Sequence, residues 1–230
     1  MYEIFRLNKI LLGESYLKIL FVSWYFPPVN TIGAVRTGKF ARFLIERGHD
    51  LGEVSGRYWG HPEPMPLGVP LERTIYAKSV DINAAPRRVA RLVRRSKPTS
   101  QTGTANTAPS QKIQSGGGLR HRLSTLYMHV TNLPDNRIGW LPWAYRGCIA
   151  LCRNWQPDLI FASGPPFTAH VVAHMASRRL GVPWVAELRD RWADDPYEEL
   201  PAWRMRIDQW LDNRVLRSGT SLVTVSEAWA

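Results

Sequence analysis

Short runs of apolar residues alternate with amphipathic segments along most of this chain. The run at 18–23 has the length and composition of a strand buried on both faces, and the Pro27–Pro28 pair prevents it from continuing. Apolar residues then recur with helical spacing over 34–47, and Gly48 supplies a common helix stop. A second strand is expected over 49–55. Strand, loop, helix and strand in this order predict the start of a doubly wound parallel sheet.

The alternation continues to the end of the chain and predicts one large domain over 17–226, preceded by an N-terminal extension at 1–16. Further strands are expected at 71–80, 157–163, 183–188 and 221–225, and further helices at 86–95, 119–130, 143–153, 167–180 and 201–216. A helix that starts at Ser226 would leave 227–230 as its truncated first turn. The predicted fold class is therefore α/β, with a Rossmann-like parallel sheet flanked by helices.

Residues 97–118 interrupt this pattern. They are mostly Ser, Thr, Gln, Gly, Ala and Pro, and Ile113 is their single large aliphatic residue. Such a segment cannot bury enough apolar area to offset its ordering entropy, so we expect a disordered insertion. Basic charge gathers in the same region. The chain has a formal net charge of +11, and nine Lys or Arg but no acidic residue lie between Asp81 and Asp135.

The basic stretch at 87–122 has three interpretations. Amphipathic helices with basic faces could lie on an anionic membrane surface. The stretch could instead be a solvated insertion without a partner. Nucleic acid would attract similar charges, but no helix-turn-helix or aromatic-interleaved pattern accompanies them, so no specific nucleic-acid partner is expected.

The sequence also indicates in which cellular compartment the protein lies and whether it binds a metal or a cofactor. No run reaches the roughly 20 apolar residues of a membrane span, and residues 1–15 lack the layout of a signal peptide. We expect a cytoplasmic protein, with peripheral contact at the inner face of the membrane left open. Cys148 and Cys152 would share one helix face as buried thiols in a reducing compartment. No further ligands stand near them, so neither a metal nor a cofactor is expected.

Polar or glycine-containing segments follow four of the predicted strands, at 24–36, at 163–168, at 188–195 and from 226 onward. Ligands of open parallel sheets bind beyond the carboxyl ends of the strands, so these segments would form the rim of one crevice. Gly33 would let an anion approach free amides at a helix start, and Arg36 could add a charged donor to a phosphate. The alternative is an ordinary strand-to-helix turn, because a single glycine matches no phosphate-binding fingerprint.

The second and third rim segments carry the remaining candidate residues. Ser163 and Gly164 stand at another helix start, where they would either contact a substrate or form a rigid turn. Arg189 and Asp190 lie in the most polar segment, where a carboxylate could orient or deprotonate a substrate hydroxyl. A solvated network of ion pairs without a chemical role would contain the same residues. Their spacing indicates no metal site.

Six segments in order resemble a known family. They lie at 18–28, 33–36, 43–50, 157–166, 185–192 and 223–226, and they read KILFVSWYFPP, GAVR, FLIERGHD, PDLIFASGPP, VAELRDRW and VTVS. In this order, with helical spacers between them, they resemble the N-terminal domain of family-4 glycosyltransferases of the GT-B fold. The resemblance extends over about 17–230 apart from the insertion.

The resemblance implies two facing Rossmann-like domains with the active site between them, and this chain would be the first half of that GT-B fold. Family members take a nucleotide-sugar donor without a required metal ion and retain the anomeric configuration. Their first domain mainly holds the acceptor, here expected to be a glycan or a lipid-linked sugar. On this resemblance Gly33 and Arg36 face the donor phosphates. Arg189 and Asp190 face the acceptor, with Asp190 as the catalytic candidate.

The chain departs from the family pattern in three places. Many members have a second glycine beside the position of Gly33, where this chain has Ile32 and Ala34. The strand over 50–55 is poorer in valine than usual. The donor-binding domain, with its pair of glutamates, is absent, so we expect no transfer by this polypeptide alone. The alternative is a non-enzymatic Rossmann-like module that docks on a membrane or a partner.

Overall fold

A computed structural model describes residues 16–57, 66, 68–84, 119–193 and 200–225. Its strands are β1 (Lys18–Ser23), β2 (Asp50–Gly56), β3 (Thr74–Ala77), β4 (Leu159–Gly164), β5 (Trp184–Leu188) and β6 (Ser221–Thr224). Its helices are α2 (Ile32–Glu46), α4 (Leu119–Thr131), α5 (Leu141–Leu151), α6 (Thr168–Leu180) and α7 (Ala202–Leu216), with 3₁₀ turns at Leu71–Arg73 and Ile138–Trp140.

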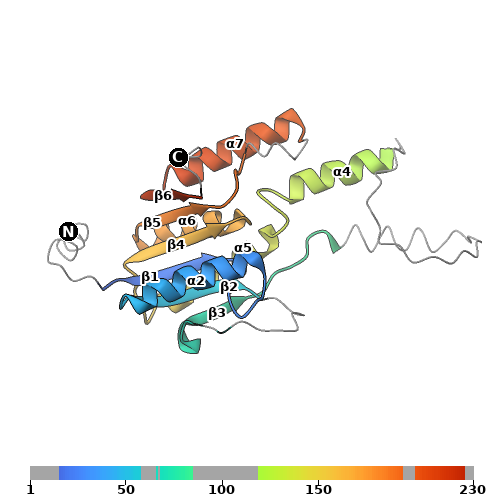
Figure 1. Cartoon of the computed structure of the whole chain (residues 1–230). Helices are drawn as coiled ribbons and strands as arrows, with labels where there is room; N and C mark the ends of the chain where they lie inside the picture. The colour runs from blue at the N-terminus through green and yellow to red at the C-terminus, as the bar shows by residue number, and fades with distance from the viewer. Residues whose placement is uncertain (1–15, 58–65, 67, 85–118, 194–199, 226–230) are drawn as a thin grey trace, which may run out of the picture.

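The strands form one parallel sheet in the order β3-β2-β1-β4-β5-β6 (Figure 1). This is the strand order of the doubly wound dinucleotide-binding folds, and it confirms the predicted Rossmann-like class. The order reverses at β1, which pairs with β2 on one side and with β4 on the other. Segments that leave β1, β4 and β5 therefore emerge side by side at one edge of the sheet.

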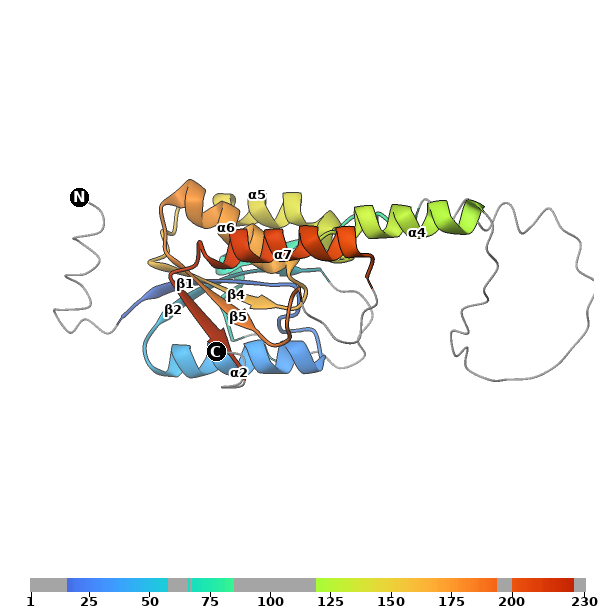
Figure 2. The ribbon, with the colours of Figure 1, turned by 90° about the horizontal axis from the view of Figure 1, so that it is seen from above.

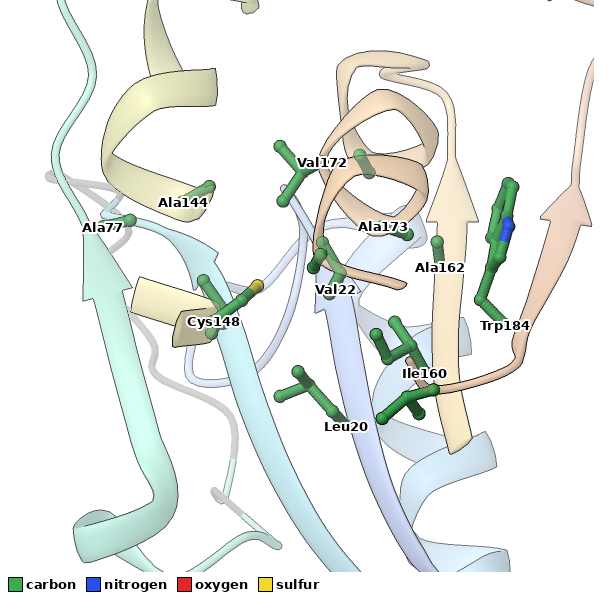
Figure 3. Close-up of a cluster of buried hydrophobic side chains, with 14 of the residues drawn as sticks. Leu20, Val22, Ala77, Ala144, Cys148, Ile160, Ala162, Val172, Ala173 and Trp184 are labelled. Atoms are coloured by element: carbon green, nitrogen blue, oxygen red, sulfur yellow. The ribbon is translucent and has the colours of Figure 1, made fainter. Parts of the chain in front are cut away.

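Helices cover the two faces of the sheet unequally (Figure 2). The α2 helix lies on one face, α5, α6 and α7 lie on the other, and α4 extends away from the sheet. Alternate strand residues fill the two layers, because successive side chains of a strand point to opposite faces. Leu20, Val22 and Ile160 pack on the α6 side, near Cys148 and Val172 (Figure 3).

The opposite layer, under α2, is smaller and more aromatic. Phe21 of β1 lies 5.0 Å from the ring centroid of Phe161 and 5.8 Å from that of Phe26. Ala34, Thr37 and Ala41 are the buried residues of α2. Small side chains there let the helix approach the aromatic layer closely, whereas Phe43, an apolar residue of the same helix, is 46% exposed.

The glycine at position 52 in β2 is explained by packing against Trp155. A Cβ on Gly52 would lie 2.7 Å from Cζ3 of Trp155, so only a glycine leaves room for the indole against the strand. The Nε1–H of Trp155 also donates to Oδ2 of Asp50 at 2.9 Å, in the same strand. The poor strand pattern over 49–55 therefore reflects a close approach between this strand and the segment after α5.

The observed boundaries differ from the predicted ones mainly where β3 and α2 begin. Residues 71–73 form a 3₁₀ turn, so β3 is shorter than expected. The α2 helix begins at Ile32 because Thr31 is its N-cap, with the Thr31 hydroxyl accepting from the Ala34 amide at 3.3 Å. Gly33 therefore lies inside the first helical turn. The predicted helix at 86–95, the insertion at 97–118 and the helix start at Ser226 lie outside the described residues.

The β6 strand forms an uncovered edge of the sheet. Leu222 and Val223 point to opposite faces, and they are 46% and 41% exposed. Neither helical layer therefore covers this strand. Within the part of the chain that the structure describes, no strand pairs with its outer side.

Candidate functional site

Three of the predicted rim segments meet at the carboxyl edge of β1, β4 and β5. The register aligns Ser23 with Ser163 and Ser163 with Glu187, so the three strands end at nearly the same level. Gly33 and Arg36 enter from α2, and Arg189 enters from the segment after β5. The structure thus brings most of the predicted site residues together.

An ion pair crosses from α2 to β5. The Nε–H of Arg36 donates to Oε1 of Glu187 at 2.7 Å. The Glu187 side chain is 6% exposed, whereas that of Arg36 is 47% exposed. Glu187 therefore anchors one side of the guanidinium, and the rest of the guanidinium remains open to solvent at the rim.

Arg189 holds the turn between β4 and α6. Its backbone N–H donates to the Gly164 carbonyl at 3.0 Å, and its Nε–H donates to the same oxygen at 3.2 Å. Its Nη2 also donates to the Pro165 carbonyl. Partial burial lowers the pKa of Arg189, and the carboxylates of Glu187 and Asp190 oppose that shift. Arginine keeps its charge under such conditions, so a fixed cation stands at the rim.

Gly33 makes room for this cation. A Cβ at Gly33 would lie 2.6 Å from Nη1 of Arg189 and 3.3 Å from Cβ of Tyr25. The first turn of α2 can therefore lie against the Arg189 guanidinium. Two arginines and the positive end of a helix dipole thus lie around the buried Glu187 carboxylate, and the exposed Asp190 carboxylate lies beside Arg189. The open side of the Arg36 guanidinium and the amides at the start of α2 are the groups that suit a bound anion such as a phosphate.

Ser163 and Gly164 face the protein interior and do not join the arginines at the rim. Ser163 is fully buried, and its hydroxyl has no hydrogen-bond partner among the described residues. A Cβ at Gly164 would collide with Cε1 of His170, so the glycine serves the packing of that ring. Both residues fit the rigid-turn interpretation better than direct contact with a substrate.

The start of α6 is already occupied by a carboxylate. The backbone N–H of Thr168 donates to Asp135 at 2.7 Å, and its hydroxyl donates to the same side chain at 2.8 Å. Burial raises the pKa of Asp135, and these hydrogen bonds oppose the shift. This helix start is thus capped from within the protein, which leaves the start of α2 as the anion-binding candidate.

Three aromatic rings, those of Phe167, His170 and Trp192, pack together next to the rim. The rings of Phe167 and Trp192 are stacked, with centroids 5.1 Å apart, and His170 lies beside both. The Nε2 atom of His170 is 3.0 Å from the backbone oxygen of Glu187. Burial lowers the pKa of His170 to about 4, so the ring is neutral near pH 7. These rings fix the end of β5, from which the Glu187 carboxylate reaches Arg36.

Asp190 follows Arg189 at the rim. It is exposed, and its charge favours the protonated form of the adjacent Arg189. Glu187 lies just before the expected rim segment at 188–195 and is not among the site residues predicted from the sequence. A glutamate inside the otherwise apolar strand 183–188 was the signal that could have identified it, since a buried carboxylate needs a charged partner.

Another buried carboxylate lies away from the rim. Glu53 of β2 is fully buried, and the Ser55 side chain is the polar group that opposes the effect of burial on its carboxyl. Burial raises the pKa of Glu53 well above its ordinary value. Burial and the charge of Glu53 also raise the pKa of Tyr76 on the neighbouring strand to about 12. Folding therefore favours the protonated form of the Glu53 carboxyl.

The two cysteines are both buried free thiols, as expected. Burial raises the pKa of Cys148 strongly and that of Cys152 to about 11, which makes both poor nucleophiles. Within the described ranges, no group of three or more His, Cys, Asp or Glu could hold a metal ion. No helix in those ranges is long and apolar enough to cross a membrane.

Comparison with known families decides the assignment. A model described as a glycosyl transferase 4-like domain matches residues 101–230, more than half of the chain. The chain belongs to this family. The matched part of this glycosyl transferase 4-like chain contains Glu187, Arg189 and Asp190. Gly33 and Arg36 precede the match, so their assignment depends on the geometry of the rim.

Two solved structures resemble part of this chain. A search of curated proteins found no match. SsfS6, a glycosyltransferase of Streptomyces sp. SF2575, is 15% identical over 74% of this chain and 39% of its own, with a TM-score of 0.37. Sucrose-phosphate synthase of Thermosynechococcus elongatus is 11% identical over 90% of this chain and 48% of its own, with a TM-score of 0.46. The glycosyl transferase 4-like chain thus spans less than half the length of these proteins.

Proposed function

We propose that this chain is the acceptor-side domain of a retaining glycosyltransferase that transfers sugar from a nucleotide donor to a glycan or lipid-linked acceptor. The observation that carries the proposal is the cluster of Arg36, Arg189 and the α2 start around Glu187. A nucleotide sugar presents a diphosphate, and its departure develops negative charge. Fixed positive groups stabilise such charge without reorganising during the reaction.

The residues take different roles in this proposal. The amides near Gly33 and the exposed side of Arg36 face the donor phosphates. Arg189 and Asp190 face the acceptor, and Asp190 orients or deprotonates its hydroxyl. Ser163 and Gly164 act indirectly, by fixing the turn to which Arg189 is hydrogen bonded. No cofactor enters the proposal.

A second domain is required for turnover. It would close over the donor, exclude water and complete the site. The chain by itself is therefore proposed to bind nucleoside diphosphates weakly and to transfer no sugar. We place the enzyme in the cytoplasm, where nucleotide sugars would reach the open edge of the sheet.

The proposal is tested by titrating the chain with a panel of nucleoside diphosphates. Arg36→Gln removes a charged donor and should weaken binding about tenfold, since a charge-assisted hydrogen bond contributes about 1.5–3 kcal/mol. Arg42→Gln is the matched control, because Arg42 lies on the same helix in an exposed pair with Glu46. Equal affinities for the two variants would remove the anion site from the proposal.

The acceptor role is tested in a chain that includes a donor domain. Asp190→Ala should lower kcat about 100-fold, within the usual contribution of general acid–base catalysis. Asp190→Asn should keep part of the orientation and lose the proton transfer. An unchanged kcat at saturating substrates would contradict the role of Asp190.

A further inference from the structure

The solvent face of α7 carries a stripe of aromatic and basic side chains that the transfer chemistry does not use. Its members recur at helical spacing on one side of the helix, and all are exposed: Trp203, Arg206, Ile207, Trp210, Arg214 and Arg217. Trp210 is 61% exposed, and the Arg214 guanidinium lies 5.6 Å from its ring. The two acidic residues of α7, Asp208 and Asp212, lie off this stripe.

The buried side chain of Arg204 determines which side of α7 faces the solvent. Its side chain is buried on the opposite side of α7, where its Nε–H donates to Asp208 at 2.6 Å. Its other nitrogens donate to the backbone oxygens of His129, Asn132 and Pro134, at and just after the end of α4. A single buried guanidinium therefore joins α7 to α4 and turns the stripe outward.

Exposed apolar residues continue from this joint along α4. The ring of Trp203 meets that of His129 edge to face, with centroids 6.3 Å apart. Leu123 and Val130 are each 57% exposed, and Leu126 is 48% exposed. Figures 1 and 2 show that α4 extends beyond the sheet from the N-terminal end of α7. We call the stripe together with Leu123, Leu126 and Val130 the α4–α7 surface.

The residues that make up this surface include arginines but no acidic residue. The α4 helix lies in the segment between Asp81 and Asp135 that has no acidic residue, and the α7 stripe adds three arginines. The acidic residues at 194–199 precede α7 and lie outside the described residues. Tryptophan favours the interface between lipid and water, and arginine can bury its stem there while its charge meets anionic headgroups.

We propose that the α4–α7 surface docks on an anionic lipid membrane. Exposed aromatic and aliphatic side chains flanked by arginines are the features of helices that lie in a membrane interface. The surface differs from the basic stretch at 87–122, since it includes α7 and uses apolar contact as well as charge. Docking requires neither the donor nor turnover, so it goes beyond the proposed transfer reaction.

Sedimentation of the full chain with lipid vesicles tests the proposal. The chain should bind vesicles of equimolar phosphatidylcholine and phosphatidylglycerol, and bind pure phosphatidylcholine much less. Trp210→Ser should lower partitioning about tenfold. Replacing Arg206, Arg214 and Arg217 by Gln should lower it roughly fivefold for each charge. Phe43→Ser is the matched control, because Phe43 is an exposed aromatic on the opposite helical layer and should leave binding unchanged.

Each other outcome overturns the proposal. Absence of binding by the native chain refutes it directly. Binding that salt abolishes but Trp210→Ser leaves intact assigns the interaction to the basic stretch at 87–122 alone. Self-association that Trp210→Ser removes, without vesicle binding, assigns the surface to a second copy of the chain. Circular dichroism shows whether each variant is folded. Titration of Trp210→Ser with nucleoside diphosphates shows whether the proposed anion site is intact, so a failure of membrane docking can be distinguished from a failure of the transferase assignment.

Discussion

Placing one methyl group at Gly33 should reveal how tightly the rim is built. In Gly33→Ala, the new Cβ lies 2.6 Å from Nη1 of Arg189 and must displace that guanidinium. Arg189 then loses side-chain hydrogen bonds to the Gly164 and Pro165 carbonyls. Bonds of charged groups contribute about 1.5–3 kcal/mol, and Arg189 is only half-buried, so we take about 2 kcal/mol for their loss. Alanine returns about 0.5–1 kcal/mol through its helix propensity. The net destabilisation should be about 1 kcal/mol.

A double-mutant cycle isolates this contact. In an Arg189→Ala background the obstruction is gone, so Gly33→Ala should become neutral or slightly stabilising, and the coupling should be about 1–2 kcal/mol. Urea unfolding followed by circular dichroism measures all four proteins. The same cost of Gly33→Ala in both backgrounds would refute the reasoning and would identify Tyr25, at 3.3 Å, as the obstruction.

Three further changes test other parts of the structure. The folded-state pKa of Glu53 is raised, so its contribution to stability is complete below the unfolded pKa and is lost as pH rises through the folded pKa. Urea titrations from pH 4 to 9 should show this decline in the native chain and not in Glu53→Gln. Arg204→Met leaves the buried Asp208 carboxylate unpaired and should cost about 3–5 kcal/mol, whereas Arg204→Met combined with Asp208→Leu should recover much of it. Asp135→Ala removes the cap from Thr168 and should lower the unfolding free energy by about 1–2 kcal/mol.

The parallel sheet and the common edge of the rim segments could be predicted from the sequence for physical reasons. Buried parallel strands are nearly continuous apolar runs, and the runs at 18–23 and 157–163 stand out from their surroundings. The carboxyl-end rule then places the segments that contain Gly33 and Arg189 at one edge. This rule follows from topology and does not require knowledge of any side chain.

Side-chain direction within that edge could not be predicted in the same way. Ser163 is buried because its position in β4 points it under α2, and strand parity becomes meaningful only when the layers are known. Helical spacing alone would place Ile207 and Trp210 on the buried side of the helix with Leu211 and Val215. Arg204 and Asp208 share the inward side of α7 with Val215, so the helix is rotated and Trp210 points to solvent. A buried ion pair gives no apolar signal, which is why periodicity misled here.

The uncovered β6 strand has a practical consequence for handling the protein. An exposed edge offers a row of backbone donors and acceptors, and Leu222 and Val223 add apolar contacts on both sides. In concentrated samples, the β6 edges of different molecules should therefore tend to pair. Such association would interfere with crystallisation and with binding titrations. A lysine in place of Leu222 would oppose such stacking through charge repulsion while leaving the rim at β1, β4 and β5 untouched.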